Sequence, residues 1–195
     1  MGVVINMKIL IVAHPDDEIL WFDSRSFDLI VIAFLGRHDK PEIENKRLKV
    51  INMHPEKNKI ILFSISESGY WKDKSRHQEH NKVKMQLMNL LETLFNKYVP
   101  SEVYTHNHLG EYGHFDHILI HNCVVQVLQN HCQIWFPFKF TQKLCKYIPH
   151  QVEKIYIPMN IEHFYQIREI YIQHEAWTWN FNYQPSPTEC FYRLI

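Results

Sequence analysis

Two short segments of this sequence gather residue types that bind metals and move protons. The first, His-Pro-Asp-Asp-Glu at residues 14–18, places an imidazole and three carboxylates directly after an apolar run. Helix capping and the helix dipole account for acids at a helix start, but not for the histidine. Because His14 and Asp17 are three positions apart, both side chains can reach one side of a first helical turn. Asp16 then projects differently and can act as a base.

The second segment, at residues 105–117, reads Thr-His-Asn-His-Leu-Gly-Glu-Tyr-Gly-His-Phe-Asp-His. His114 and His117 are three residues apart at an expected helix start, so both can face one way. Together the two segments offer imidazoles and a carboxylate to a metal, with another carboxylate left over. Catalytic zinc sites use three such ligands and leave a position for water, whose pKa falls to about 7. An adjacent unligated carboxylate completes a hydrolytic site.

The chain holds 14 histidines, so pairs that share this spacing by chance must be weighed. His77 and His80 form such a pair, but they lie in a charged stretch with no strand before it and no glycine turn. This context favours the second segment over that pair as a source of metal ligands. Three further histidines are expected to shape the loop, to support a ligand or simply to belong to a helix: His106, His108 and His121.

The motif Ala-His-Pro-Asp-Asp-Glu, followed by His-Asn-His-Leu-Gly-Glu-Tyr-Gly-His-Phe-Asp-His, resembles the LmbE-like, or PIG-L, family of zinc-dependent N-deacetylases. The resemblance covers residues 7–122, including the order of strands between the motifs. It implies one zinc ion per chain, which other divalent ions can replace. It also implies an N-acetylglucosamine-type substrate carried by a glycolipid, thiol precursor, antibiotic or related conjugate.

The resemblance also implies a role for each matching residue. The implied metal ligands are His14, Asp17 and His117, and the implied general base is Asp16. His114 stabilises the oxyanion or protonates the leaving amine, Asp116 orients His114, and Tyr112 lies near the substrate carbonyl.

The chain departs from the family pattern after the first motif, where family members have a glycine-threonine pair and a longer helix. The substrate-binding arginine of the family is not fixed by position, and Arg37 and Arg47 are the two candidates. For each arginine, the alternative is a solvated surface charge. Trp177 and Trp179 can stack on a sugar, with packing in the core or in a lid as the alternative.

Hydrophobic periodicity predicts the elements that position these segments. Apolar runs at 8–13, 27–35 and 59–65, and a shorter one at 102–105, predict strands. Strands alternating with helices indicate an α/β, Rossmann-like single domain over residues 1–195, with a largely parallel sheet flanked by helices. Ligands bind beyond the carboxyl ends of the strands in such sheets, and both motifs follow strands.

The remaining elements are less regular in sequence. Residues 81–98 have an apolar face and predict a helix, and a second helix is expected from 117 to 129. Residues 154–157 predict a last strand, and Asn160 is expected to cap a final helix. The segment with Pro185 and Pro187 reads as an irregular tail lying on the domain.

Composition argues against several classes of protein. Lysine plus arginine equal aspartate plus glutamate at 21 each, so no net charge draws the chain to nucleic acid or an anionic membrane. The four cysteines form no Cys-x-x-Cys pair and are expected to be free thiols. The N-terminal apolar stretch is too short for a transmembrane segment and lacks a cleavage site, which favours a cytoplasmic location. The oligomeric state is left open.

Three other functions fit the residues less well. A metal hydrolase acting on phosphate esters needs more bridging carboxylates than the single acidic cluster supplies. A zinc nucleobase deaminase needs His-x-Glu and Pro-Cys-x-x-Cys motifs, which this sequence lacks. A catalytically inactive metal- or sugar-binding module has no need for a base beside the metal. The sequence therefore predicts an N-deacetylase that releases acetate and a free amine.

Overall fold

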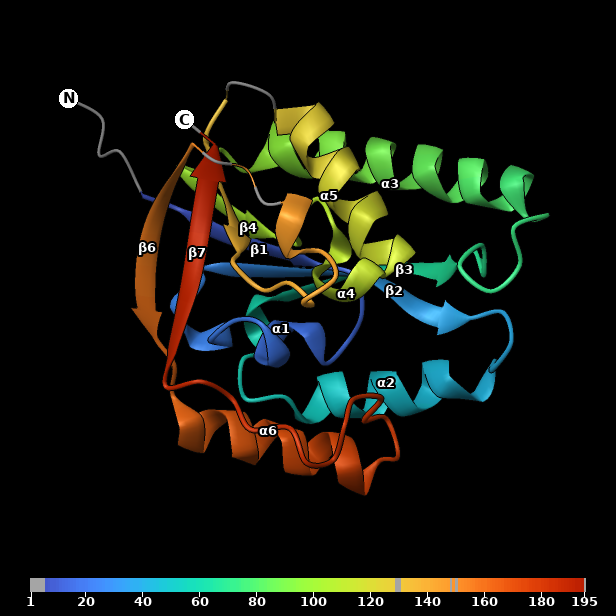
Figure 1. The fold of residues 1–195 in the computed structure, drawn as a ribbon. Coiled ribbons are helices and arrows are strands. Elements are labelled where there is room, and N and C mark those ends of the chain that lie inside the picture. Colours follow the sequence, from blue (N-terminus) through green and yellow to red (C-terminus); the bar gives the residue numbers. More distant parts are fainter. Residues whose placement is uncertain (1–5, 129–130, 148, 150, 195) are drawn as a thin grey trace.

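The computed structural model describes residues 6–128, 131–147, 149 and 151–194, and it shows a sheet between two layers of helices (Figure 1). Within these residues the sheet has seven strands in the order β3-β2-β1-β4-β5-β7-β6. Neighbouring strands from β3 to β5 are parallel, whereas β7 is antiparallel to β5 and β6. This confirms the expected Rossmann-like, largely parallel sheet flanked by helices. The strands are β1 Lys8–Val12, β2 Leu29–Arg37, β3 Ile60–Glu67, β4 Glu102–Thr105, β5 Gln133–Pro137, β6 Val152–Pro158 and β7 Thr188–Leu194.

The central strand β1 is buried on both of its faces. Leu10 and Val12 belong to the core beneath α1, α2 and α6, and Ile9 and Ile11 to the core beneath α3 and α5. Figure 1 shows these two helical layers on opposite sides of the sheet. Because successive side chains of a strand point to opposite faces, an unbroken apolar run is needed here. The helices are α1 Asp17–Leu20, α2 Glu42–Met53, α3 His77–Lys97, α4 Gly110–Gly113, α5 Phe115–Leu128 and α6 Ile161–Gln173, with short 3-10 turns at Ser24–Ser26, Lys57–Lys59 and Cys145–Tyr147.

The expected strands and helices are present, with some ends shifted. The strand expected at 27–35 extends to Arg37, because Gly36 continues it. A Cβ on Gly36 would lie 2.6 Å from Ser66 Oγ and 2.9 Å from Glu44 Oε2, so glycine permits close packing rather than ending the strand. Asn160 caps α6 as expected, and its Oδ1 accepts a hydrogen bond from the His163 amide at 2.7 Å. The end expected for α5, residue 129, lies outside the described residues.

Two elements differ from the sequence expectations. The expected tail is wrong, because residues after Pro187 form β7 and insert between β5 and β6, burying Phe191 and Tyr192. The strand at 154–157 is therefore not the last one, although it is present within β6. Helix α2 was not expected, because its buried face mixes a few aliphatic residues with the charged Arg47.

The two motifs leave the same edge of the sheet. β1 and β4 are neighbours, and Ile11 pairs with Thr105, so both following loops begin side by side. Cys123, Cys132 and Cys190 are free thiols as expected, whereas the side chain of Cys145 is outside the description. Among the described helices none is long and apolar enough to cross a membrane. Residues 1–5 of the N-terminal stretch lie outside the described part.

Candidate active site and metal centre

The turn after β1 holds Asp16 in an unusual backbone conformation. Asp16 has a φ of 98°, a left-handed value that costs free energy for a residue with a Cβ. Its amide contacts Glu18 Oε2 at 2.8 Å and the Tyr171 hydroxyl at 2.9 Å, and that hydroxyl donates to Glu18 Oε1 at 2.7 Å. Glu18 and Tyr171, from α6, therefore stabilise the turn that separates Asp16 from Asp17.

Asp17 lies at the centre of the candidate metal ligands. Its Oδ2 is 3.3 Å from His14 Nδ1 and 3.4 Å from His117 Nε2. Two ligands of a tetrahedral zinc ion with bonds of ~2.0–2.1 Å are separated by ~3.4 Å, so both spacings match such a site. His117 Nε2 is buried and has no hydrogen-bond partner among the described residues. The two spacings to Asp17 and the unpartnered nitrogen therefore fit a divalent metal ion at this position.

Other residues compete geometrically for the same position. Within the described residues, ligand atoms lie within 4.8 Å of one another in three groups: His14 with His114 and His117, Asp17 with His106 and His117, and His14 with Glu67 and Asp116. The sequence-based set joins members of the first two groups and is not itself one of them. His106 is the main alternative, since its Nε2 is also 3.4 Å from Asp17 Oδ2. That nitrogen accepts a hydrogen bond from the Ala13 amide at 2.9 Å, so its lone pair is already used.

Glu111 is the residue that orients the histidines, and the sequence did not single it out. Its Oε2 accepts from His117 Nδ1 at 2.6 Å and from His106 Nδ1 at 3.0 Å, while Oε1 accepts from the Asn107 amide at 2.8 Å. With its proton on Nδ1, His117 presents the Nε2 lone pair toward Asp17. Carboxylates commonly fix metal-binding histidines in this way. The sequence signal that could have identified Glu111 is its position between two glycines in a histidine-rich segment.

His14 also has carboxylates behind it. Its Nε2 is 3.4 Å from Asp116 Oδ2 and 3.6 Å from Glu67 Oε1, on the ring edge opposite Asp17. Asp116 was expected to orient His114, but its carboxylate lies 3.9 Å from His114 Nδ1 and closer to His14. The Asp116 amide instead donates to His114 Nδ1 at 3.3 Å.

His114 and Tyr112 lie at the open side of the cluster. Burial, with a further contribution from His14, lowers the pKa of His114 to about 3, so its ring is neutral. Because Nδ1 accepts from the Asp116 amide, the ring proton lies on Nε2, which can donate a hydrogen bond. The Tyr112 ring centroid is 5.7 Å from that of His114 and 5.5 Å from that of His117.

Asp16 faces the pocket beside Asp17, and a residue from the C-terminal segment holds its carboxylate. Thr178 Oγ1 donates to Asp16 Oδ2 at 2.6 Å, and the Thr178 amide contacts the same oxygen at 3.3 Å. Burial and the neighbouring charge of Asp17 raise the pKa of Asp16 to about 7. Such a value suits a group that must accept and return a proton near neutral pH. Thr178 has no local sequence signal.

The two candidate arginines both line the active-site pocket. Arg47 is buried rather than solvated, and it donates to the Leu35 carbonyl at 3.0 Å and to Glu67 Oε1 at 3.1 Å. Arg37 pairs with Asp39 at 3.1 Å and lies 3.6 Å from Glu67 Oε2. The surface alternative is therefore wrong for Arg47, and Glu67, which the sequence did not single out, joins both guanidinium groups to His14.

The two candidate tryptophans have different positions. Trp177 is buried in the core against Phe164 and Tyr171, as the packing alternative expected. Trp179 lines the active-site pocket together with Trp71 and Tyr112. Of the two, Trp179 alone lines that pocket. The histidines at 108 and 121 make structural contacts, to the Tyr192 hydroxyl and to the His106 carbonyl respectively.

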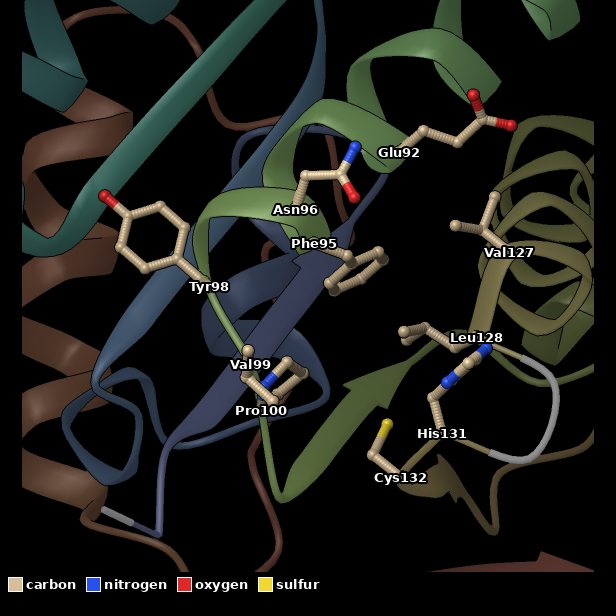
Figure 2. Close-up of a pocket in the computed structure, with 10 residues that line it drawn as sticks. All are labelled: Glu92, Phe95, Asn96, Tyr98, Val99, Pro100, Val127, Leu128, His131 and Cys132. Carbon is tan, nitrogen blue, oxygen red and sulfur yellow. The ribbon is translucent and has the colours of Figure 1, made fainter. Parts of the chain in front are cut away.

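A separate hollow of about 500 Å³ lies between the C-terminal ends of α3 and α5, beside the start of β4 (Figure 2). Figure 2 shows Phe95, Val127 and Leu128 around it, with Glu92 and Asn96 at its margin. None of the candidate ligands or catalytic residues lines this hollow. The candidate ligands and catalytic residues therefore lie at the carboxyl edge of the sheet and not in this hollow.

No protein-family model and no curated protein sequence matches the chain. Solved structures do match it. The deacetylase of the A40926 pseudoaglycone superposes with a TM-score of 0.63 at 10% identity, covering 96% of each chain. A zinc-inhibited form of teicoplanin deacetylase gives 0.64 at 10% identity, covering 95% of this chain and 97% of the other. A deacetylase–teicoplanin complex gives 0.63 at 11% identity with the same coverage. At this identity the likeness establishes a shared fold over nearly the whole chain.

Proposed function

We propose that the chain is a zinc-dependent hydrolase that removes the acetyl group from an N-acetylglucosamine-type sugar or glycoconjugate. Residues 1–195 would form one deacetylase domain of the LmbE-like, or PIG-L, type. The observation that carries the proposal is the carboxylate of Asp16 beside that of Asp17, and the Asp17 Oδ2 lies within 3.4 Å of three imidazole nitrogens. Deacetylase structures that share the fold support the same reaction class.

The chain's own residues supply most of the required chemistry. His14, Asp17 and His117 would hold the ion, which when bound polarises the acetamide carbonyl and acidifies water. Asp16 accepts the proton of the attacking water, and Thr178 keeps its carboxylate in place. The neutral His114 donates its Nε2 proton in a hydrogen bond to the developing oxyanion, an effect of about 2.7–4 kcal/mol for one well-placed donor. Collapse of the tetrahedral state gives acetate and an amine, and Asp16 returns to that amine the proton it took from water, because the ring of His114 is neutral.

The matched substitutions Asp16→Asn and Asp17→Asn test this assignment. We expect Asp16→Asn to keep about one zinc per chain, because asparagine still accepts from Thr178 and the ligands are untouched. Acetate release from methyl N-acetylglucosaminide should fall by about 100-fold to 10,000-fold, since the base is lost. Asp17→Asn should lose zinc, because a neutral amide is a weaker ligand.

Elemental analysis and an acetate assay on the same preparations read out both effects. A metal-free Asp16→Asn protein, or one with full turnover, would overturn the roles given to the two aspartates. A wild-type protein with bound zinc and no acetate release from any N-acetyl sugar would instead indicate an inactive binding module.

A further inference from the structure

An aromatic groove of about 230 Å³ adjoins the active-site pocket. Its walls include the rings of Trp21, Tyr112, Phe140 and Trp179, which together define the aromatic groove. The Trp179 centroid lies 5.0 Å from that of Tyr112 and 5.4 Å from that of Trp21. These rings are tilted against one another rather than stacked flat, so their edges and faces bound an open space. Tyr112 is exposed, Phe140 and Trp179 are half-buried, and Trp21 is buried. A hollow lined by aromatic rings in this way commonly marks a binding site.

The groove offers no uncompensated charge to a ligand. Lys139 is the one lysine or arginine among its lining residues, and its Nζ is 3.0 Å from the buried Glu189 Oε2. Glu111 is also a lining residue, but its carboxylate is buried and accepts hydrogen bonds from two imidazoles. Charged ligands would therefore lose hydration here without gaining a partner, whereas apolar groups would displace water at little cost.

The segment that carries Phe140 is hydrogen-bonded to the second motif. The Asn107 side-chain amide donates to the Lys139 carbonyl at 2.8 Å, and the Thr141 amide donates to the Glu111 carbonyl at 3.2 Å. Phe140 therefore sits on a backbone that the motif itself holds. A preformed groove loses less conformational entropy on binding than a flexible one.

The groove is continuous with the catalytic pocket. Tyr112 and Trp179 line both spaces, and Trp179 follows Thr178, the residue that holds Asp16. Tyr112 links the groove to the candidate metal ligands, because its ring centroid lies 5.5 Å from that of His117. On the premise of the proposed deacetylase function, we propose that the aromatic groove binds an uncharged apolar aglycone of the N-acetyl sugar. The sugar's acetamide then enters the polar pocket while the aglycone remains between the aromatic rings.

A series of alkyl N-acetylglucosaminides tests the proposal with zinc-loaded enzyme. We expect kcat/KM to rise about threefold to fourfold for each methylene added from the methyl to the butyl glycoside. The increase in kcat/KM should come from a lower KM at unchanged kcat, because the aglycone is bound equally in the ground and transition states. A glycoside of butyl length that ends in a carboxylate should lose this gain. Equal kcat/KM for methyl, butyl and carboxyl-terminated glycosides would overturn the proposal.

Two substitutions make the test local. Phe140→Ser should reduce the ratio of butyl to methyl kcat/KM, whereas Phe181→Ser, which changes an exposed phenylalanine outside the groove, should leave the ratio unchanged. If both substitutions lower the ratio equally, the groove is not the cause. Should Phe140→Ser fail to fold, binding to the Asp16→Asn protein decides the question, with tryptophan fluorescence as the readout. There the butyl glycoside should bind more tightly than the methyl glycoside.

The outcomes separate the groove from the reaction. Acetate release from the methyl glycoside with no dependence on chain length refutes the groove and leaves the deacetylase intact. Length-dependent binding by Asp16→Asn, without acetate release by the wild type, supports the groove and refutes the deacetylase.

Discussion

Replacing Glu111 by glutamine should weaken metal binding without changing a candidate ligand. The Glu111 carboxylate accepts three hydrogen bonds, two from imidazoles and one from the Asn107 amide. Glutamine offers one oxygen and one NH₂ group at the same positions. If the glutamine oxygen faces the imidazoles, the NH₂ group faces the Asn107 amide. In the reverse orientation the NH₂ group faces His106 and His117. Either orientation leaves at least one buried donor without an acceptor.

The expected magnitude follows from these contacts. A buried donor left unsatisfied costs about 1–3 kcal/mol, so the free energy of unfolding should fall by at least that amount. His117 would also lose the partner that keeps its proton on Nδ1 and its Nε2 lone pair toward Asp17. Losing a carboxylate that orients a ligand typically weakens metal affinity by about 10-fold to 100-fold. Zinc affinity measured by competition with a chelator, beside thermal unfolding of the metal-free protein, reads the two effects separately.

Backbone strain at this position is the competing explanation. Glu111 has a φ of 57°, where glycine is favoured over any residue with a Cβ. Glu111→Gly relieves that strain but removes the carboxylate, so we expect zinc affinity to fall at least as far as in Glu111→Gln. Glu175→Gly is the matched control, since Glu175 is exposed, has a φ of 54° and does not line the pocket of the candidate ligands. Zinc affinity in Glu111→Gly equal to that of the wild type would refute the orienting role of the carboxylate.

Two further predictions concern histidines. Burial lowers the pKa of His54 to about 4 from its usual 6.5, so the unfolded chain binds more protons below pH 6.5 and stability falls as pH falls. Relative to His54→Asn, the free energy of unfolding of the wild type, measured with urea, should fall by about 2 kcal/mol between pH 7 and pH 5. The pKa of the neighbouring Glu18 is raised to about 8, and this contribution is present in both proteins. His77→Ala and His80→Ala should retain zinc in elemental analysis while His117→Ala loses it, and equal losses would contradict the choice of ligands.

The residues of the site that the sequence predicted directly follow strands, and those strands can be recognised from short apolar runs. An apolar run such as that of β1 specifies a strand buried on both faces, and β4 follows from the same rule. Since these strands are adjacent and parallel, their following loops must meet, which brings His14 and His117 toward Asp17. Spacing within a few residues, combined with sheet topology, was sufficient there.

The supporting residues depend on contacts across most of the chain. Thr178 lies 162 residues after Asp16, and no periodic pattern connects the two. Glu67 ends the edge strand β3, where a charged residue is ordinarily solvated, yet α2 brings Arg47 to it. The strand β7 was missed because two prolines before it suggested an irregular segment, whereas they only precede its first paired residue. Tertiary packing decided each of these positions.

The distance in sequence between Asp16 and its partners sets the order in which the site can be completed during synthesis. The last of the three candidate ligands, His117, lies in the first turn of α5, so a chain made only as far as that turn already contains every candidate metal donor. Tyr171 and Thr178, which hold the backbone and carboxylate of Asp16, come 155 and 162 residues after it. A chain that ends before Tyr171 therefore contains every candidate metal donor but lacks both groups that hold Asp16. Catalytic turnover would then require the complete chain, whereas metal binding alone would not.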